Sequence, residues 1–318
     1  MPGRGGAPMA DRRVLMLTGA LLVAALVFLT WQLREPVGFI LSLRAGKLVA
    51  LILVGAATGA ATVLFQTVIG NRLLTPGIVG FDALFIFLQT MLVLVLGGIG
   101  FSQLHPNLSF LGEAALMTGA ALLLFHLLLR RGAQDIARMV LTGIVLGLLF
   151  RGLAEFAQRM LEPSQFSIVQ YATFASFNSV ETANLGLAGV VIALAILAAL
   201  RLAPALDVAA LGRPVARGLG LGYDRVVMQA LALVAAATAL VGPMTFLGLI
   251  AASLAREVVP ESRHALLLPA AAVTGAIILV AGQFLFERLM GQQSALGVIV
   301  EFLGGLLFLA LVLGRRRL

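Results

Sequence analysis

The feature that most constrains this chain is a series of long apolar segments spread over almost its whole length. Of 318 residues, 61% are hydrophobic and only 11% are charged, whereas a soluble domain is about half apolar and a quarter charged. The mean hydropathy of +1.07 excludes a soluble globular enzyme, a disordered chain and a coiled coil. Because one membrane-spanning helix needs about 20 apolar residues, the composition predicts an all-α, polytopic membrane protein.

Apolar windows, broken at polar or Pro/Gly clusters, divide the chain into about ten predicted transmembrane helices. The eighth window is short, and only Gly242 and Pro243 separate it from the seventh. Residues 164–183 are too polar to face lipid, which indicates an irregular outer segment with at most one short helix. The predicted spans are 14–33, 48–69, 81–101, 111–129, 137–156, 184–201, 226–241, 244–255, 267–286 and 296–313.

The arginines are concentrated in the loops on one side of the predicted spans, and this asymmetry predicts the orientation of the chain in the cell (inner) membrane. Cytoplasmic loops carry an excess of Lys and Arg, and ten spans with an inner N-terminus place most basic residues inside. The formal net charge of +8 therefore reflects topology and predicts no nucleic-acid partner. We expect both termini in the cytoplasm, residues 1–13 as a cytoplasmic tail, and residues 14–318 as one transmembrane domain whose first span is retained rather than cleaved.

The sequence lacks the residue patterns of common catalytic and metal sites. It contains no cysteine, which excludes disulfides and thiolate sites. Its only lysine, Lys47, is followed by Leu and completes no Walker A motif, so the chain cannot hydrolyse ATP as a P-loop ATPase. The three histidines are far apart in sequence and predict no metal site. This inventory disfavours catalysis and predicts no cofactor bound by the chain itself.

Ionisable residues in or near the predicted spans are costly to place there and point to function. Arg151 and Glu155 are four residues apart and share a helix face. They form either an ion pair at the headgroup level or the polar lining of a pathway. Glu301 lies about one turn into the last span, and its structural and pathway interpretations are equally open. Asp82 begins the third span, where we interpret it as an N-terminal helix cap.

Two pairs of glycines have the spacing that lets helices approach closely. They are Gly55 with Gly59 and Gly143 with Gly147. Such pairs are frequent by chance in a chain with 35 glycines, so we interpret them as packing features without a specific function.

One segment, residues 64–90, carries a recognisable motif. Its sequence LFQTVIGNRLLTPGIVGFDALFIFLQT resembles the Gln-x(4–5)-Asn-Pro-Leu-x-x-Pro-x-x-x-Gly signature of the FecCD or BtuC-like family. These are permease subunits of ABC importers for iron–siderophores, haem and cobalamin. Asn71, Pro76 and Gly80 occupy positions of this signature. The sequence of the segment is most similar to the branch of the family that serves catecholate-type ferric siderophores.

Two further segments are similar to the same family, in the same order along the chain. One is GPMTFLGLI at residues 242–250, followed by Arg256, Arg263-His264 and a later LLLP; the other is LGRPVARGLG at 211–220. The three matches cover about residues 40–318. Ala252-Ser253 replaces a family Pro-His pair, and Gln283 replaces a family Asp, which affects contacts of single residues rather than the resemblance.

The resemblance implies a BtuC-like ABC importer permease fold and a definite set of partners. They are two ABC ATPase subunits that use ATP and Mg²⁺, a second permease subunit, membrane lipid and a periplasmic or lipid-anchored substrate-binding protein. The two permeases form a heterodimer by preference, with a homodimer still open. The implied function is ATP-driven import of a ferric siderophore by alternating access. Haem or cobalamin import and an ion-coupled secondary transporter are the alternatives, and an integral membrane enzyme is disfavoured.

The resemblance also assigns expected roles to single residues. An inner coupling loop at about 256–266 would contact the ATPases, and basic residues on the outer side would bind acidic residues of the binding protein. The coupling residues are Arg256, Glu257, Glu261, Arg263 and His264. The docking residues are Arg44, Lys47 and Arg288, for which headgroup anchoring is the alternative. The pathway candidates are Gln89, Arg151, Glu155 and Glu301.

Overall fold

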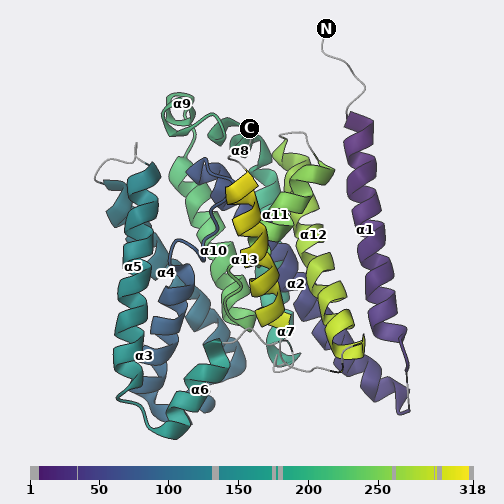
Figure 1. Ribbon diagram of the computed structural model, residues 1–318, viewed down its shortest axis with the longest axis vertical. Coiled ribbons are helices and arrows are strands. Elements are labelled where there is room, and N and C mark those ends of the chain that lie inside the picture. Colours follow the sequence, from purple (N-terminus) through teal and green to yellow (C-terminus); the bar gives the residue numbers. More distant parts are fainter. Residues whose placement is uncertain are drawn as a thin grey trace.

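The computed structural model describes residues 7–33, 35–130, 136–173, 177, 182–259, 263–289, 291 and 296–314. Within these residues the chain is a bundle of helices without a strand (Figure 1). The helices are α1 (Ala7–Thr30), α2 (Val37–Ile69), α3 (Phe81–Ser102), α4 (Pro106–Arg130), α5 (Ile136–Gln158), α6 (Pro163–Thr173), α7 (Thr182–Arg201), α8 (Ala203–Ala209), α9 (Arg213–Gly218), α10 (Tyr223–Val241), α11 (Leu247–Val258), α12 (His264–Phe284), the π-helical turn η1 (Leu285–Leu289) and α13 (Leu296–Gly314). The all-α prediction is confirmed.

Several helices are long and apolar enough to cross a membrane. Among the described residues these are α1, α2, α3, α5, and α12 with η1. Helices α7 and α8, bent by 60° relative to each other, form a sixth candidate if they are taken as one span, and α10 and α13 are shorter apolar helices. The chain is thus a multi-pass membrane protein. Each predicted span coincides with one helix, whereas the count of ten crossings stays a prediction.

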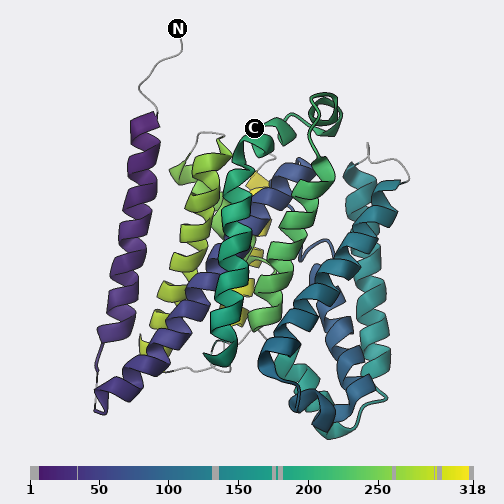
Figure 2. The same ribbon diagram turned by 180° about the vertical axis from the view of Figure 1, so that it is seen from behind.

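The short helices mark the two ends of the bundle. Helices α8 and α9 lie at the end of the bundle where α1 starts, and α6 lies at the other end with η1 (Figures 1 and 2). We call these the α8–α9 end and the α6 end. The polar segment at 164–183 contains the short helix α6, as expected. Helices α8 and α9 were not predicted.

Helix α2 is the central element of the bundle, packed against α12, α10, α11 and α7. Glycines bring α2 and α12 into backbone contact: a Cβ added at Gly55 would lie 2.5 Å from the carbonyl oxygen of Gly275. One added at Gly59 would collide with the carbonyl of Ala271. The interpretation of Gly55 and Gly59 as a packing pair is confirmed.

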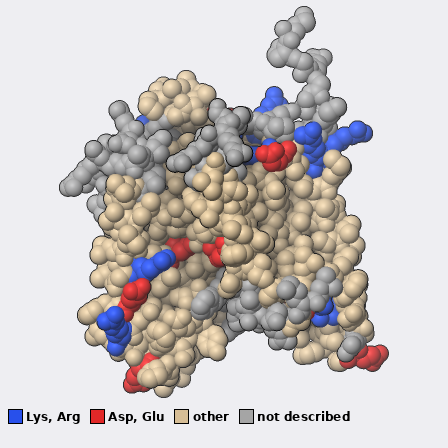
Figure 3. Space-filling view, in the orientation of Figure 1, with Lys and Arg blue, Asp and Glu red and all other residues tan. Residues whose placement is uncertain are grey.

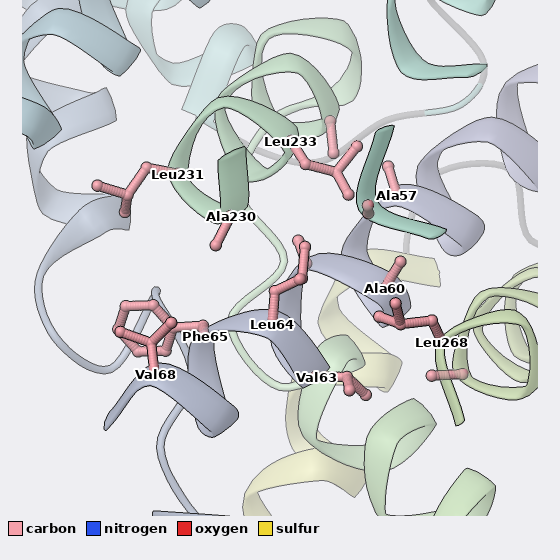
Figure 4. Close-up of a cluster of buried hydrophobic side chains, with 14 of the residues drawn as sticks. Ala57, Ala60, Val63, Leu64, Phe65, Val68, Ala230, Leu231, Leu233 and Leu268 are labelled. Carbon is pink, nitrogen blue, oxygen red and sulfur yellow. The ribbon is translucent and has the colours of Figure 1, made fainter. Parts of the chain in front are cut away.

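The second half of α2 also carries the apolar core. Leu64, Phe65 and Val68 point from α2 into a cluster that includes Leu231 and Leu233 of α10 (Figure 4). Leu64 and Leu233 have no exposed surface. In a lipid environment such contacts stabilise through close van der Waals packing rather than through removal from water, so the fit of these side chains fixes how α10 lies on α2.

Helix α2 begins at Val37, eleven residues before the predicted span. The prediction excluded this stretch because it holds Arg44 and Lys47. In the structure the guanidinium of Arg44 donates to the carbonyl oxygens of Leu29 at 2.8 Å and Trp31 at 2.7 Å, which belong to the end of α1. The last carbonyls of a helix have no partner within it. The buried cation satisfies them, so α2 continues through the charged stretch.

Candidate translocation and coupling sites

The family-like motif forms a compact turn between α2 and α3. Gly70 adopts a left-handed conformation with φ of 69° and ends α2. Asn71 Oδ1 then accepts the backbone N–H of Leu73 at 3.0 Å, and Gln66 Nε2 donates to the carbonyl of Arg72 at 2.6 Å. The amide side chains replace the helical hydrogen bonds that are lost at the turn, so they fix the direction in which α3 leaves.

The end of this turn is pressed against α5. The carbonyl of Pro76 accepts the N–H of Phe81 at 3.2 Å, and Gly80 has a φ of 97°, which only glycine adopts readily. A Cβ at Gly80 would lie 2.9 Å from the carbonyl oxygen of Gly143 and 2.9 Å from Cα of Gly147. The second glycine pair is therefore also a packing feature, and it receives the family-like motif itself.

Two carboxylates meet where α10 gives way to α11. Asp82, in the first turn of α3, accepts a short hydrogen bond from the hydroxyl of Thr245. Glu301 Oε1, from α13, accepts the backbone N–H of Phe246 at 3.2 Å. Gly80 occupies the N-cap position of α3, and no side chain caps this helix. The interpretation of Asp82 as a cap is thus wrong: its carboxylate reaches a second element instead of its own amides.

A row of exposed charges leads toward these carboxylates. Arg151 and Glu155 are exposed on α5, one turn apart, and Arg159 follows after a further turn. Figure 3 shows charged side chains that run diagonally from the lower left toward the centre of this face, with uncharged side chains on both sides of the row. No salt bridge joins Arg151 to Glu155 among the described residues. The row and the carboxylates form one polar face on an apolar bundle.

Gln89 lies elsewhere. Its side chain is buried between α3 and α4, where Nε2 donates to Glu113 Oε2 at 2.5 Å. Ser109 donates to the other oxygen of Glu113 at 2.8 Å. A second polar contact lies next to this one: Gln158 at the end of α5 donates a hydrogen bond to the hydroxyl of Thr90 in α3 at 3.1 Å. These bonds hold α3, α4 and α5 together, so the geometry gives Gln89 a packing contact rather than a place on the polar face.

The predicted coupling residues lie at the α8–α9 end. Arg256 is half-buried in the last turn of α11, and its Nη1 has no hydrogen-bond partner among the described residues. Burial and the nearby charge of Arg72 lower the pKa of Arg256 to about 10, so the guanidinium stays charged at neutral pH. Glu257 and Arg263 are exposed, and Glu261 falls outside the described residues. No salt bridge joins Arg256 or Arg72 to a carboxylate among the described residues, so both cations add positive charge to this end.

His264 is buried at the start of α12 and joins three elements. Its backbone N–H and ring Nδ1 lie 2.9 Å and 2.6 Å from Oδ1 of Asp207 in α8. Its Nε2 lies 2.7 Å from the hydroxyl of Thr67 in α2. His264 is therefore an internal contact of this end of the bundle, placed beside the exposed Arg263.

The three predicted docking cations line a single cavity of about 540 Å³ at the α6 end. Lys47 Nζ lies 3.0 Å from Glu287 Oε2, and Arg288 lies 3.6 Å from the other oxygen of that carboxylate. Arg44 is buried with 6% of its surface exposed and is engaged with α1. The cavity thus has three cations around one carboxylate, with Lys47 and Arg288 nearer to its surface.

Sequence reasoning missed Glu113, Asp207, Thr245 and Glu287, which hold the predicted residues in place. Glu113 could have been noticed as an acid within a predicted span, which is the signal that selected Glu301. The other three follow only from contacts between elements distant in sequence. In the described part of the chain no group of three or more His, Asp or Glu residues could hold a metal ion.

Comparisons with known proteins agree on one family. The model of the FecCD transport family matches residues 15–314. The petrobactin import system permease protein YclO of Bacillus subtilis is 36% identical over 305 residues, covering 95% of this chain and 96% of that protein. The petrobactin import system permease protein FatC of Bacillus anthracis is 32% identical, covering 86% of this chain and 79% of that protein.

A solved structure shares the fold. It is an inward-facing conformation of a metal-chelate type ABC transporter, with a TM-score of 0.76 and 22% sequence identity, covering 95% of this chain and 99% of that chain. At this identity the likeness establishes the BtuC-like permease fold and nothing about the substrate.

Proposed function

Because this chain belongs to the FecCD transport family, we propose that it is the transmembrane permease subunit of an ABC importer that moves a ferric siderophore into the cytoplasm. The observation that carries the proposal is the 36% identity with a petrobactin import permease over 95% of the chain. The polar face on the apolar bundle supports it, because charges are exposed at membrane depth only where water or another protein covers them.

The polar face is our candidate translocation pathway. Arg151 and Glu155 are exposed on α5, and Glu301 of α13 and Asp82 of α3 bind the adjacent residues Phe246 and Thr245. In the proposed alternating-access cycle a second permease subunit faces this surface and the chelate passes between the two chains. A chelate needs a wide, weakly binding passage, and a row of well-separated charges provides one. We favour a heterodimer of two different permease chains.

The α8–α9 end is our candidate surface for the ATPase subunits. We infer that this end is cytoplasmic, with both termini on the same side, and that residues 256–266 form the coupling loop. Arg256 and Arg263 would face carboxylates of the ATPase, with Glu257 and Glu261 beside them, while His264 anchors the loop from inside. The ATPase subunits would supply the ATP and Mg²⁺ chemistry, and this chain would bind no cofactor of its own.

The cavity at the α6 end is our candidate docking site for the substrate-binding protein. Lys47 and Arg288 would meet acidic residues of that protein, since complementary charges speed and orient association. The bonds of Arg44 to the end of α1 give it a supporting position: it adds positive charge to the cavity while its guanidinium remains inside.

The decisive experiment is co-purification followed by transport. The tagged chain is expressed with its neighbouring genes, and the complex is reconstituted in liposomes with its binding protein. We expect a P-loop ATPase, together with a second permease, and ATP-dependent uptake of a ferric catecholate chelate. A chain that purifies alone and drives chelate uptake with an ion gradient would overturn the proposal in favour of a secondary transporter. Uptake of haem or cobalamin instead would retain the family mechanism and reassign the substrate.

A further inference from the structure

The break between α10 and α11 is held by side chains from two other helices. Helix α10 ends at Val241, Gly242 adopts a φ of 103°, and Pro243 has no N–H to donate. Thr245 and Phe246 follow before α11 begins at Leu247. We call Thr245 and Phe246 the joint.

The first contact comes from α3. The hydroxyl of Thr245 donates to Oδ2 of Asp82, and the family-like turn holds this carboxylate in place. A Cβ added at Gly77 of that turn would lie 2.5 Å from the same oxygen and 2.9 Å from Cγ2 of Thr245. The turn, the carboxylate and the joint therefore lie in contact, and a side chain at position 77 would not fit between them.

The second contact comes from α13 and uses one face of that helix. Glu301 Oε1 accepts the N–H of Phe246 at 3.2 Å. A Cβ at Gly304 would collide with the Phe246 side chain, and the ring of Phe308 lies 6.1 Å from the ring of Phe246. Residues three and seven positions apart share a helix face. One face of α13 therefore contacts Phe246 three times: Glu301 accepts its N–H, Gly304 leaves room for its side chain, and Phe308 packs near its ring.

Helix α11 joins these contacts to the α8–α9 end. It has 12 residues between the joint and Val258, which corresponds to about 18 Å at 1.5 Å per residue. A Cβ at Gly248 would collide with the hydroxyl of Thr62 in α2, so α11 lies tightly on the central helix. A short, packed helix moves as a unit, because close-packed interiors transmit displacement instead of absorbing it.

We propose that Thr245 and Phe246 form a positioning joint that transmits the movement of α11 to α3 and α13. The inference deepens the proposed function and rests on it: the ATPases would act on the end of α11 at Arg256, and α3 and α13 carry the carboxylates of the pathway. Thr245, through Asp82, and Phe246, through Glu301, are positioning residues that make chelate passage follow ATP hydrolysis.

The test compares variants of Thr245 in the reconstituted complex, with two rates measured on the same vesicles. They are ATP hydrolysis stimulated by the loaded binding protein, and uptake of ferric chelate. Thr245→Val keeps the shape and removes the donor, whereas Thr245→Ser keeps the donor. Thr274→Val is the matched control, because the hydroxyl of Thr274 is buried but bonds only within its own helix, to Ala270 at 2.7 Å.

We expect Thr245→Val to lower the chelate imported per ATP about tenfold, a typical size for coupling between sites, while stimulated hydrolysis persists. Thr245→Ser and Thr274→Val should keep the wild-type ratio. An unchanged ratio in Thr245→Val, or a parallel loss of hydrolysis and uptake, would overturn the joint. If the wild-type complex itself shows no ATP-dependent uptake, the proposed function fails, which is a distinct result.

A second measurement does not depend on activity. The chain has no cysteine, so spin labels can be placed at Leu254 of α11 and Val95 of α3, which are 45% and 80% exposed. If Thr245 couples these two helices, trapping the ATP-bound state changes the distance between the labels more in Thr245→Val than in wild type, since α11 then moves without α3. Equal changes in the two proteins would contradict the proposal.

Discussion

Asp207 Oδ1 receives two bonds from His264, one from its backbone N–H at 2.9 Å and one from its ring at 2.6 Å. The carboxylate comes from α8 and serves as the missing N-terminal cap of α12, since Arg263 at the cap position makes no such bond. An unpredicted short helix thus fixes the first turn of a long one, next to the candidate coupling surface.

Asp207→Ala removes this cap, and we expect it to cost about 1 kcal/mol, the usual value for a lost N-terminal cap. Asp207→Asn keeps an oxygen acceptor and should retain most of the stability. Thermal unfolding of the purified complex in detergent measures both. Equal unfolding temperatures for the Ala and Asn variants would show that the contact contributes nothing.

Arg263→Glu tests the coupling surface. The side chain of Arg263 is exposed at the end of the bundle that also holds Arg256 and Arg72, and charge reversal should repel an acidic ATPase partner. We expect ATP-driven uptake to be lost while the chain inserts into the membrane at the wild-type level. Arg201→Glu is the control, because Arg201 is also exposed but lies at the end of α7. Normal uptake by Arg263→Glu would refute the assignment.

At the cavity of the α6 end, variants can distinguish residues proposed to bind the substrate-binding protein from residues that stabilise the fold. We expect Arg288→Glu to weaken binding-protein association about tenfold at low salt, and the difference to shrink near 1 M salt, where the Debye length is about 3 Å. Arg44→Gln should instead lower the thermal stability, because it releases the carbonyls of Leu29 and Trp31. Titration calorimetry and melting curves check the two effects. A salt-independent loss for Arg288→Glu would point to a packing defect.

Gly80→Ala should damage the packing of the motif turn on α5. The substitution adds a side chain at a φ of 97° and within 2.9 Å of the α5 backbone. The backbone strain at this positive φ alone costs about 1–3 kcal/mol. Gly112→Ala, at a position with nothing within 4 Å of the added carbon, should be neutral. The monodisperse fraction in size-exclusion chromatography reports the result, and similar fractions for both variants would contradict it.

Much of the helical framework could be predicted because apolar windows and helix boundaries coincide in membrane proteins. The break at Gly242-Pro243 was visible for the same reason. The prediction failed at the start of α2, where Arg44 looked like an end of the span. A charged residue marks the end of a membrane helix only where its side chain is solvated by water. Arg44 instead donates to the unpaired carbonyls at the end of α1, so the helix can continue through it.

The candidate sites were less predictable, since they depend on pairs that are distant in sequence. Asp82 was interpreted as a cap from its local position, yet its partner Thr245 lies 163 residues further along the chain. Gln89 was predicted on the pathway from its place near the motif, and its partner Glu113 of α4 could not be inferred from that position; its pathway role stays a prediction. A single sequence shows which residues are polar but not which of them face each other.

The attachment of α1 has a consequence for how the protein is made. This helix contacts α12 more extensively than its neighbour α2, with the ring of Trp31 5.5 Å from that of Phe284. Synthesis at about 5–20 residues per second separates the emergence of these two partners by roughly ten to fifty seconds. During that interval α1 must reside in the bilayer without its main neighbour. Many apolar side chains of α1, such as Leu22 and Leu26, are exposed. Lipid can solvate these side chains until α12 has been synthesised and inserted.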